Sequence, residues 1–137
     1  LTKPLRCGRF EDAVKEIREQ GGISVLQHPY RGHTDIEGLA KAVDVIEAFN
    51  GLTKHNENRK ASELAKRLNK PVVASSDAHI LSYIGICYTV VDRPVRENLL
   101  RGNTKLVTGY PSFGARIRNR LREIKYLLKR KKIRLLR

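Results

Sequence analysis

Short apolar runs that alternate with helical patterns constrain the fold of this 137-residue chain more than any other feature. Helical patterns span 10–20, 35–42, 56–68 and 95–101, and strand patterns span 23–26, 43–49, 72–75 and 85–91. The amphipathic pattern at 56–68 lies between two strand patterns, which is typical of a β-α-β unit with parallel strands. The sequence therefore predicts an α/β fold with a parallel sheet, whose functional groups lie at the carboxyl ends of strands.

Two polar strings stand where such strands end. Gln27-His28-Pro29 follows the first apolar run, and Ser75-Ser76-Asp77-Ala78-His79 ends the third. Asp77 and His79 are two residues apart, so in extended backbone their side chains point to the same side. Imidazole and carboxylate groups together favour a transition-metal hydrolytic site. A turn histidine and a helix N-cap aspartate are the plainer interpretation.

Three longer strings carry a resemblance to a known family: G-G-I-S-V-L-Q-H-P-Y-R, D-V-I-E-A-F-N-G, and V-V-A-S-S-D-A-H with I-G following. They resemble the C-terminal half of the PHP (polymerase and histidinol phosphatase) superfamily of metal-dependent phosphoesterases. The resemblance covers residues 12–90, and residues 44–85 are similar to the PHP-associated C-terminal region. It implies that residues 1–110 form the C-terminal part of a distorted (β/α)7 barrel. The segment 111–137 lies outside the resemblance and is expected to form a basic C-terminal helix or tail.

The resemblance also implies a metal site. His28 matches the ligand of the family's HP motif, and Asp77 and His79 match its D-x-H pair. In the family, two or three divalent ions, here Mn, Zn or Fe, activate water and stabilise charge on a phosphate. The family's H-x-H motif, D-H pair and early bridging Glu have no counterpart in this sequence, which also contains no methionine. We therefore expect a fragment that lacks upstream motifs and has little activity in isolation.

Two further residues are candidates for the site. Glu47, within the apolar run 43–49, is a candidate metal ligand or partner of a ligand histidine, and pairing with a basic residue is the alternative. Arg31 is a candidate contact of a substrate phosphate through its planar guanidinium, and an unpartnered loop arginine is the alternative. The expected substrates are phosphate mono- or diesters, which include phosphorylated small molecules, nucleotides and oligonucleotides.

The C-terminal segment 116–137 has a different character. It contains 11 Lys or Arg residues and one acidic residue, so it carries +10 of the net charge of +14. Apolar residues recur there at helical spacing, which predicts an amphipathic basic helix. The candidate polyanion contacts are Arg116, Arg120, Lys129, Arg130, Lys131 and Lys132. The alternative function is therefore a non-catalytic nucleic-acid-binding protein, and a solvated tail or a lipid-surface helix are further interpretations.

The remaining composition bears on location. The apolar runs are too short for a transmembrane segment, and no signal-peptide pattern is present. Cys7 and Cys87 lie far apart and neither belongs to a C-x-x-C motif, which favours a reducing compartment. Cys87 itself stands in an apolar run and is expected to be a small buried residue. We expect a cytoplasmic protein.

Overall fold

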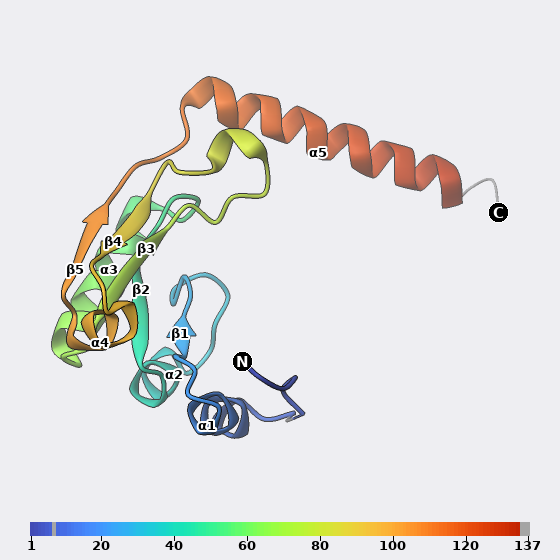
Figure 1. The fold of residues 1–137 in the computed structure, drawn as a ribbon. Helices are drawn as coiled ribbons and strands as arrows, with labels where there is room; N and C mark the ends of the chain where they lie inside the picture. The colour runs from blue at the N-terminus through green and yellow to red at the C-terminus, as the bar shows by residue number, and fades with distance from the viewer. Residues whose placement is uncertain (7, 135–137) are drawn as a thin grey trace.

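The computed structural model describes residues 1–6 and 8–134, without the side chains of residues 123 and 126–134. Helices and strands alternate along most of the chain (Figure 1). The elements are α1 (Phe10–Glu19), β1 (Val25–Leu26), α2 (Ile36–Ala42), β2 (Val45–Asn50), α3 (His55–Arg67), β3 (Val72–Ser75), the 3-10 turn η1 (Leu81–Tyr83), β4 (Tyr88–Val91), α4 (Val95–Arg101), β5 (Thr104–Val107) and α5 (Phe113–Arg134).

The first three strands form a parallel sheet in the order β1-β2-β3. Val25 of β1 is in register with Val45 of β2, and Ile46 of β2 is in register with Val72 of β3. Helix α3 connects β2 to β3, so the predicted β-α-β unit is confirmed. Because parallel strands end at the same edge of a sheet, the loops after β1, β2 and β3 are brought together.

The last two strands depart from the prediction. The sequence pattern was expected to continue the parallel sheet beyond residue 85, but β4 and β5 form a separate antiparallel pair. Helix α4 connects the two strands, and none of its residues is fully buried. Side chains attach this strand pair to β3. The Thr89 hydroxyl donates to the Ala74 carbonyl and accepts from its N–H, and the Thr104 hydroxyl donates to the Val72 carbonyl.

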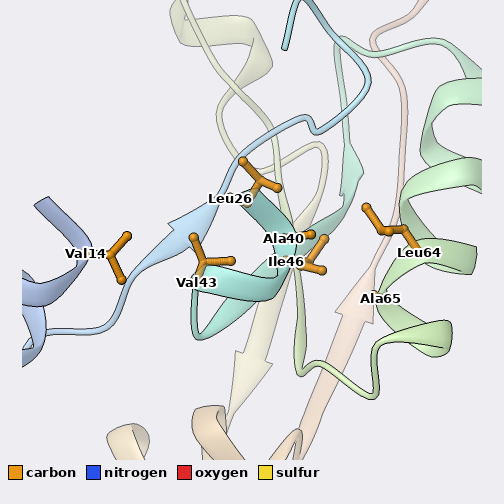
Figure 2. Close-up of a cluster of buried hydrophobic side chains, with 7 residues drawn as sticks. All are labelled: Val14, Leu26, Ala40, Val43, Ile46, Leu64 and Ala65. Carbon is orange, nitrogen blue, oxygen red and sulfur yellow. The ribbon is translucent and has the colours of Figure 1, made fainter. Parts of the chain in front are cut away.

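The core lies between the parallel sheet and its helices (Figure 2). Its buried members come from α1, β1, α2, β2, α3 and the turn after α2: Val14, Leu26, Ala40, Val43, Ile46, Leu64 and Ala65. Each large apolar side chain buried there contributes about 1.5–3 kcal/mol. This packing fixes β2 at the centre of the sheet, and with it the loops at the carboxyl edge.

The described residues form two open sheets and no closed barrel. The α/β class is therefore confirmed, while the seven-stranded barrel and the boundary at residue 110 stay predictions. The predicted basic helix is present as α5, which extends away from the sheets (Figure 1). None of the helices in the described part of the chain is long and apolar enough to span a lipid bilayer.

Candidate functional site

A buried carboxylate organises the carboxyl edge of the parallel sheet. Glu47, in the middle of β2, is only 2% exposed. The backbone N–H of His28 donates to its Oε2 at 2.6 Å, and the side-chain amide of Asn50 donates to the same oxygen at 3.1 Å. The Ser75 hydroxyl donates to Oε1. Glu47 thus connects the loop after β1 with the last residues of β2 and β3.

The hydrogen bonds that Glu47 accepts bear on whether it could contact an ion. Both carboxylate oxygens accept hydrogen bonds from groups of the protein. Charge-assisted bonds of this kind are stronger than neutral ones, and a buried carboxylate needs them to offset its lost hydration. The arrangement favours positioning of the His28 loop over direct contact of Glu47 with an ion.

His28 has an unusual backbone conformation at the end of β1. Its φ of 31° lies in the left-handed region, which costs a non-glycine residue about 1–3 kcal/mol and is common at functional sites. Its Nδ1 is buried and has no hydrogen-bond partner among the described residues. Its ring stacks on the ring of His33, with centroids 5.6 Å apart. A ring nitrogen without a hydrogen-bond partner is available to contact a bound ion or ligand.

Asp77 also has a left-handed backbone, with a φ of 49°. The expected extended geometry of the D-x-H pair is therefore wrong, since β3 already ends at Ser75. The chain instead turns so that Nδ1 of His79 lies 2.7 Å from the Asp77 carbonyl oxygen. A carbonyl only accepts, so Nδ1 carries the proton in this contact, and Nε2 is then the nitrogen with a free lone pair.

An ion pair joins the two candidate loops. Arg31, three residues after His28, places its Nη1 2.7 Å from Oδ2 of Asp77. Arg31 thus has a carboxylate partner, and its proposed contact with a substrate phosphate stays a prediction. Among the described residues, no group of three or more His, Cys, Asp or Glu is arranged to hold an ion. The metal roles of His28, Asp77 and His79 likewise stay predictions.

A hollow of about 610 Å³ opens beside His79. It is lined by residues of the η1 loop and of α5: Ala78, His79, Ile80, Leu81, Ser82, Ile84, Arg118 and Arg122. The sequence pattern placed Arg118 and Arg122 in a charged run but did not single them out. Only the path of the chain from β5 into α5 brings these two guanidinium groups to the same hollow as His79.

The start of α5 is anchored, and its continuation is open. Ala115 is buried, and its carbonyl accepts a hydrogen bond from the Tyr83 hydroxyl at 3.3 Å. Beyond it, Ile117, Leu121 and Ile124 are 44%, 62% and 45% exposed, so the apolar stripe does not pack on the domain.

The candidate polyanion contacts lie along the same helix. Nε of Arg116 donates a hydrogen bond to the Pro111 carbonyl, and the side chain or backbone of Arg120 also has a partner within the structure. The side chains of Lys129, Arg130, Lys131 and Lys132 lie outside the described residues. The polyanion role of all six residues stays a prediction.

Cys87 is a structural residue, as predicted. It is 2% exposed, and its thiol donates to the Ser75 carbonyl with Sγ 2.7 Å from the oxygen. Burial raises the pKa of this thiol. Backbone hydrogen bonds from Gly109 and Gly51 lower the pKa by less, and the charge of Glu47 adds a smaller increase. Cys87 therefore packs beneath the carboxyl edge of the sheet as a neutral thiol.

Comparison with known proteins agrees with part of this picture. Residues 55–105, from the start of α3 to β5, match the family model described as PHP-associated. No curated protein and no solved structure matches the chain. The matched span contains Asp77 and His79 but not His28. It supports the resemblance of this part of the chain to the C-terminal region of the PHP superfamily.

Proposed function

We propose that this chain is part of a PHP-type metal-dependent phosphoesterase, a hydrolase of phosphate mono- or diesters, including nucleotides and oligonucleotides. The observation that carries the proposal is the Arg31–Asp77 ion pair of 2.7 Å. It joins the loop with the HP string to the loop with the D-x-H string, at the edge where ligands of parallel α/β sheets bind. The PHP-associated match at residues 55–105 supports the same reading.

His28, Asp77 and His79 would hold divalent Mn, Zn or Fe in this proposal. Two or three ions would be present in the complete protein, which needs the family's upstream ligands as well. When bound, such ions activate water and stabilise charge on a phosphate. The buried, unpaired Nδ1 of His28 and the free Nε2 of His79 are donor atoms of the right chemistry.

The other residues of the edge would position the ligands and the substrate. Glu47 holds the backbone of His28, and Arg31 holds the carboxylate of Asp77. Arg118 and Arg122 line the hollow beside His79, where guanidinium groups suit the oxygens of a phosphate. A cytoplasmic location belongs to the proposal as well, because Cys7 and Cys87 lie far apart in the sequence and do not suggest a disulfide framework.

Divalent-ion binding tests the metal proposal directly. Mn²⁺ titration of the 137-residue chain, followed by electron paramagnetic resonance, should give affinities about tenfold weaker for His28→Ala, Asp77→Ala and His79→Ala than for the wild type. His55→Ala, outside the proposed ligand set, is the control. Equal affinity in all five proteins would remove the metal proposal, and circular dichroism checks that each variant is folded.

Activity tests the phosphoesterase proposal separately. In a chain that carries the upstream motifs, hydrolysis of a generic phosphodiester with Mn²⁺ should fall by about two orders of magnitude or more for His28→Ala and Asp77→Ala. Unchanged hydrolysis in both variants would contradict the enzyme reading, whatever the outcome of the ion titration.

The second candidate function is non-catalytic binding of nucleic acid through α5. The open face of α5, with exposed Arg118 and Arg122, favours it. Basic side chains on such a helix give salt-dependent affinity for phosphate backbones without sequence preference. Deletion of residues 116–137 should then abolish retention on a polyanion column at moderate salt, and retention that survives the deletion would count against this function.

A further inference from the structure

A second hollow, separate from the one beside His79, lies where β2 leads into α3. It encloses about 260 Å³. It is lined by Gly51, Leu52, Thr53, Lys54, His55, Tyr110 and Arg116. The lining comes from the loop after β2, the start of α3 and the segment that precedes and begins α5, so residues more than 50 positions apart enclose it. None of the proposed metal ligands is among its lining residues.

The lining of this hollow is basic. Lys54 and Arg116 carry positive charge, His55 adds an imidazole, and no carboxylate stands among the lining residues. Neither Lys54 nor Arg116 takes part in an ion pair among the described residues, although the fold contains several pairs elsewhere. Two cations without an acidic partner in one small hollow favour an anionic ligand.

Two of these groups, Arg116 and His55, are also held in place. Nε of Arg116 donates to the Pro111 carbonyl at 3.1 Å, and its guanidinium lies 5.8 Å from the centroid of the Tyr110 ring. The ring of His55 packs on the same Tyr110 ring, with centroids 4.2 Å apart. Groups that are ordered before binding lose less entropy when a ligand arrives, which favours affinity.

Thr53 provides an independent observation in the same wall. It is 5% exposed, and its Oγ1 has no hydrogen-bond partner among the described residues. Buried hydroxyls without a partner are uncommon, because they lose hydrogen bonds to water without compensation. The 13-residue helix α3 begins two residues later, and its N-terminus is already capped by Glu57, whose Oε2 accepts from the Lys54 backbone N–H at 3.3 Å, so the anion site rests on the side chains of the hollow.

We propose that this hollow binds a phosphate group, with Lys54, Arg116 and His55 as charged or polar contacts and Thr53 as a hydroxyl contact. Phosphate oxygens accept several hydrogen bonds at once, which matches a guanidinium, an ammonium and a hydroxyl around one small volume. The site stands on its own contacts and does not depend on metal binding at His28, Asp77 and His79.

Amide chemical shifts would locate the site. The ¹⁵N-labelled chain is titrated with inorganic phosphate, and sodium chloride is reduced at each step so that the ionic strength stays constant. The largest shifts are expected at Gly51, Thr53 and His55, with saturation. Shifts spread evenly along α5, without saturation, would overturn the proposal, because they would indicate general attraction to a basic chain.

Matched variants separate a specific site from net charge. Lys54→Gln with Arg116→Gln should weaken phosphate binding by about tenfold or more. Lys66→Gln with Lys105→Gln removes the same charge from exposed positions outside the hollow and should leave the affinity unchanged. An equal loss in both double variants would overturn the site.

Thr53→Val keeps the shape of the side chain and removes the hydroxyl. Phosphate affinity should fall severalfold while the ligand-free chain unfolds at the same or a higher temperature, since an unpaired buried hydroxyl is lost. Unchanged phosphate affinity would remove Thr53 from the proposal. Ribose 5-phosphate extends the titration: tighter binding than inorganic phosphate identifies a sugar phosphate, equal binding identifies the phosphate group alone, and no binding of either overturns the site.

Discussion

The carboxyl edge of the parallel sheet and helix α5 arrange their polar groups in opposite ways. At the sheet edge, the buried carboxylate of Glu47 accepts hydrogen bonds from three donors on three segments. Along α5, the apolar side chains of Ile117, Leu121 and Ile124 remain exposed beside basic residues. The first region is fixed by contacts within the fold, whereas the second offers its groups to solvent or to a partner. Substitutions should therefore affect the two regions very differently.

The largest effect is expected at the centre of the sheet edge. Glu47→Ala leaves the His28 N–H, the Asn50 amide and the Ser75 hydroxyl without their acceptor, and should lower the free energy of unfolding by about 4 kcal/mol. Urea denaturation followed by circular dichroism measures this loss. Glu63→Ala, on the exposed side of α3, is the matched control and should change stability by about 0.5 kcal/mol or less. Similar losses in both variants would mean that the Glu47 network does not stabilise the edge.

A pair of leucines compares the core with the α5 stripe. Leu64 is 1% exposed and Leu121 is 62% exposed. Leu64→Ala should cost about 3 kcal/mol because it removes buried apolar contacts and leaves a cavity. Leu121→Ala should change stability by about 0.5 kcal/mol or less, because alanine is an equally good helix former. A large loss at Leu121 in thermal unfolding would show that a partner covers the stripe, and dilution of the protein would reveal self-association.

Acid pH should destabilise the contact between Asp44 and Ser24, the residue that precedes β1. Burial opposes ionisation of Asp44, but hydrogen bonds from Ser24 and the charge of Arg18 outweigh it and lower the pKa of Asp44 below its usual value. A lowered folded-state pKa contributes stability that is present above the unfolded-state pKa of 3.8 and is lost as pH falls through the folded-state pKa.

The variant Asp44→Asn isolates this contribution. It should cost about 2 kcal/mol at pH 7, since it weakens the charge-assisted bonds to Ser24 and Arg18. The difference from the wild type should shrink as the pH is lowered below 3.8. Urea denaturation at a series of pH values checks this, and a difference that stays constant to pH 2 would contradict the assignment to Asp44.

The smallest effect is expected at the ion pair between the two candidate loops. The side chains of Arg31 and Asp77 are 45% and 21% exposed, so water and salt screen the pair. Arg31→Gln should lower the free energy of unfolding by only about 0.5 kcal/mol. A double-mutant cycle with Asp77→Asn measures the coupling. Zero coupling in solution would show that the ion pair does not hold the two loops together.

The sequence predicted those parts of the fold that local patterns determine. Alternating apolar runs and the amphipathic span 56–68 were sufficient for the β-α-β unit. The antiparallel β4-β5 pair was missed because a short strand pattern does not reveal its partner, and because no strand was predicted at 104–107, where β5 lies. The left-handed turn at Asp77 was missed because the prediction assumed extended backbone as far as His79, whereas β3 ends at Ser75.

The candidate site was predictable only as a set of residue types at strand ends. The sequence placed Glu47 in a buried strand, but its donors at His28 and Ser75 lie 19 and 28 positions away. The partner of Arg31 lies 46 positions away. Such pairings depend on which loops the sheet brings together, and no local pattern records them. The basic lining of the hollow at α3 was missed for the same reason, because Arg116 reaches it from another element.

The bond between the Cys87 thiol and the Ser75 carbonyl also has a consequence for chemical reactivity. Thiolates, not thiols, react with oxidants and alkylating agents, so a buried thiol with a raised pKa is protected twice. Exposure of the sulfur requires that its contact with the end of β3 at Ser75 is broken. Modification of Cys87 therefore reports transient opening of the fold where β4 begins, and the intact fold protects the sulfur from oxidation.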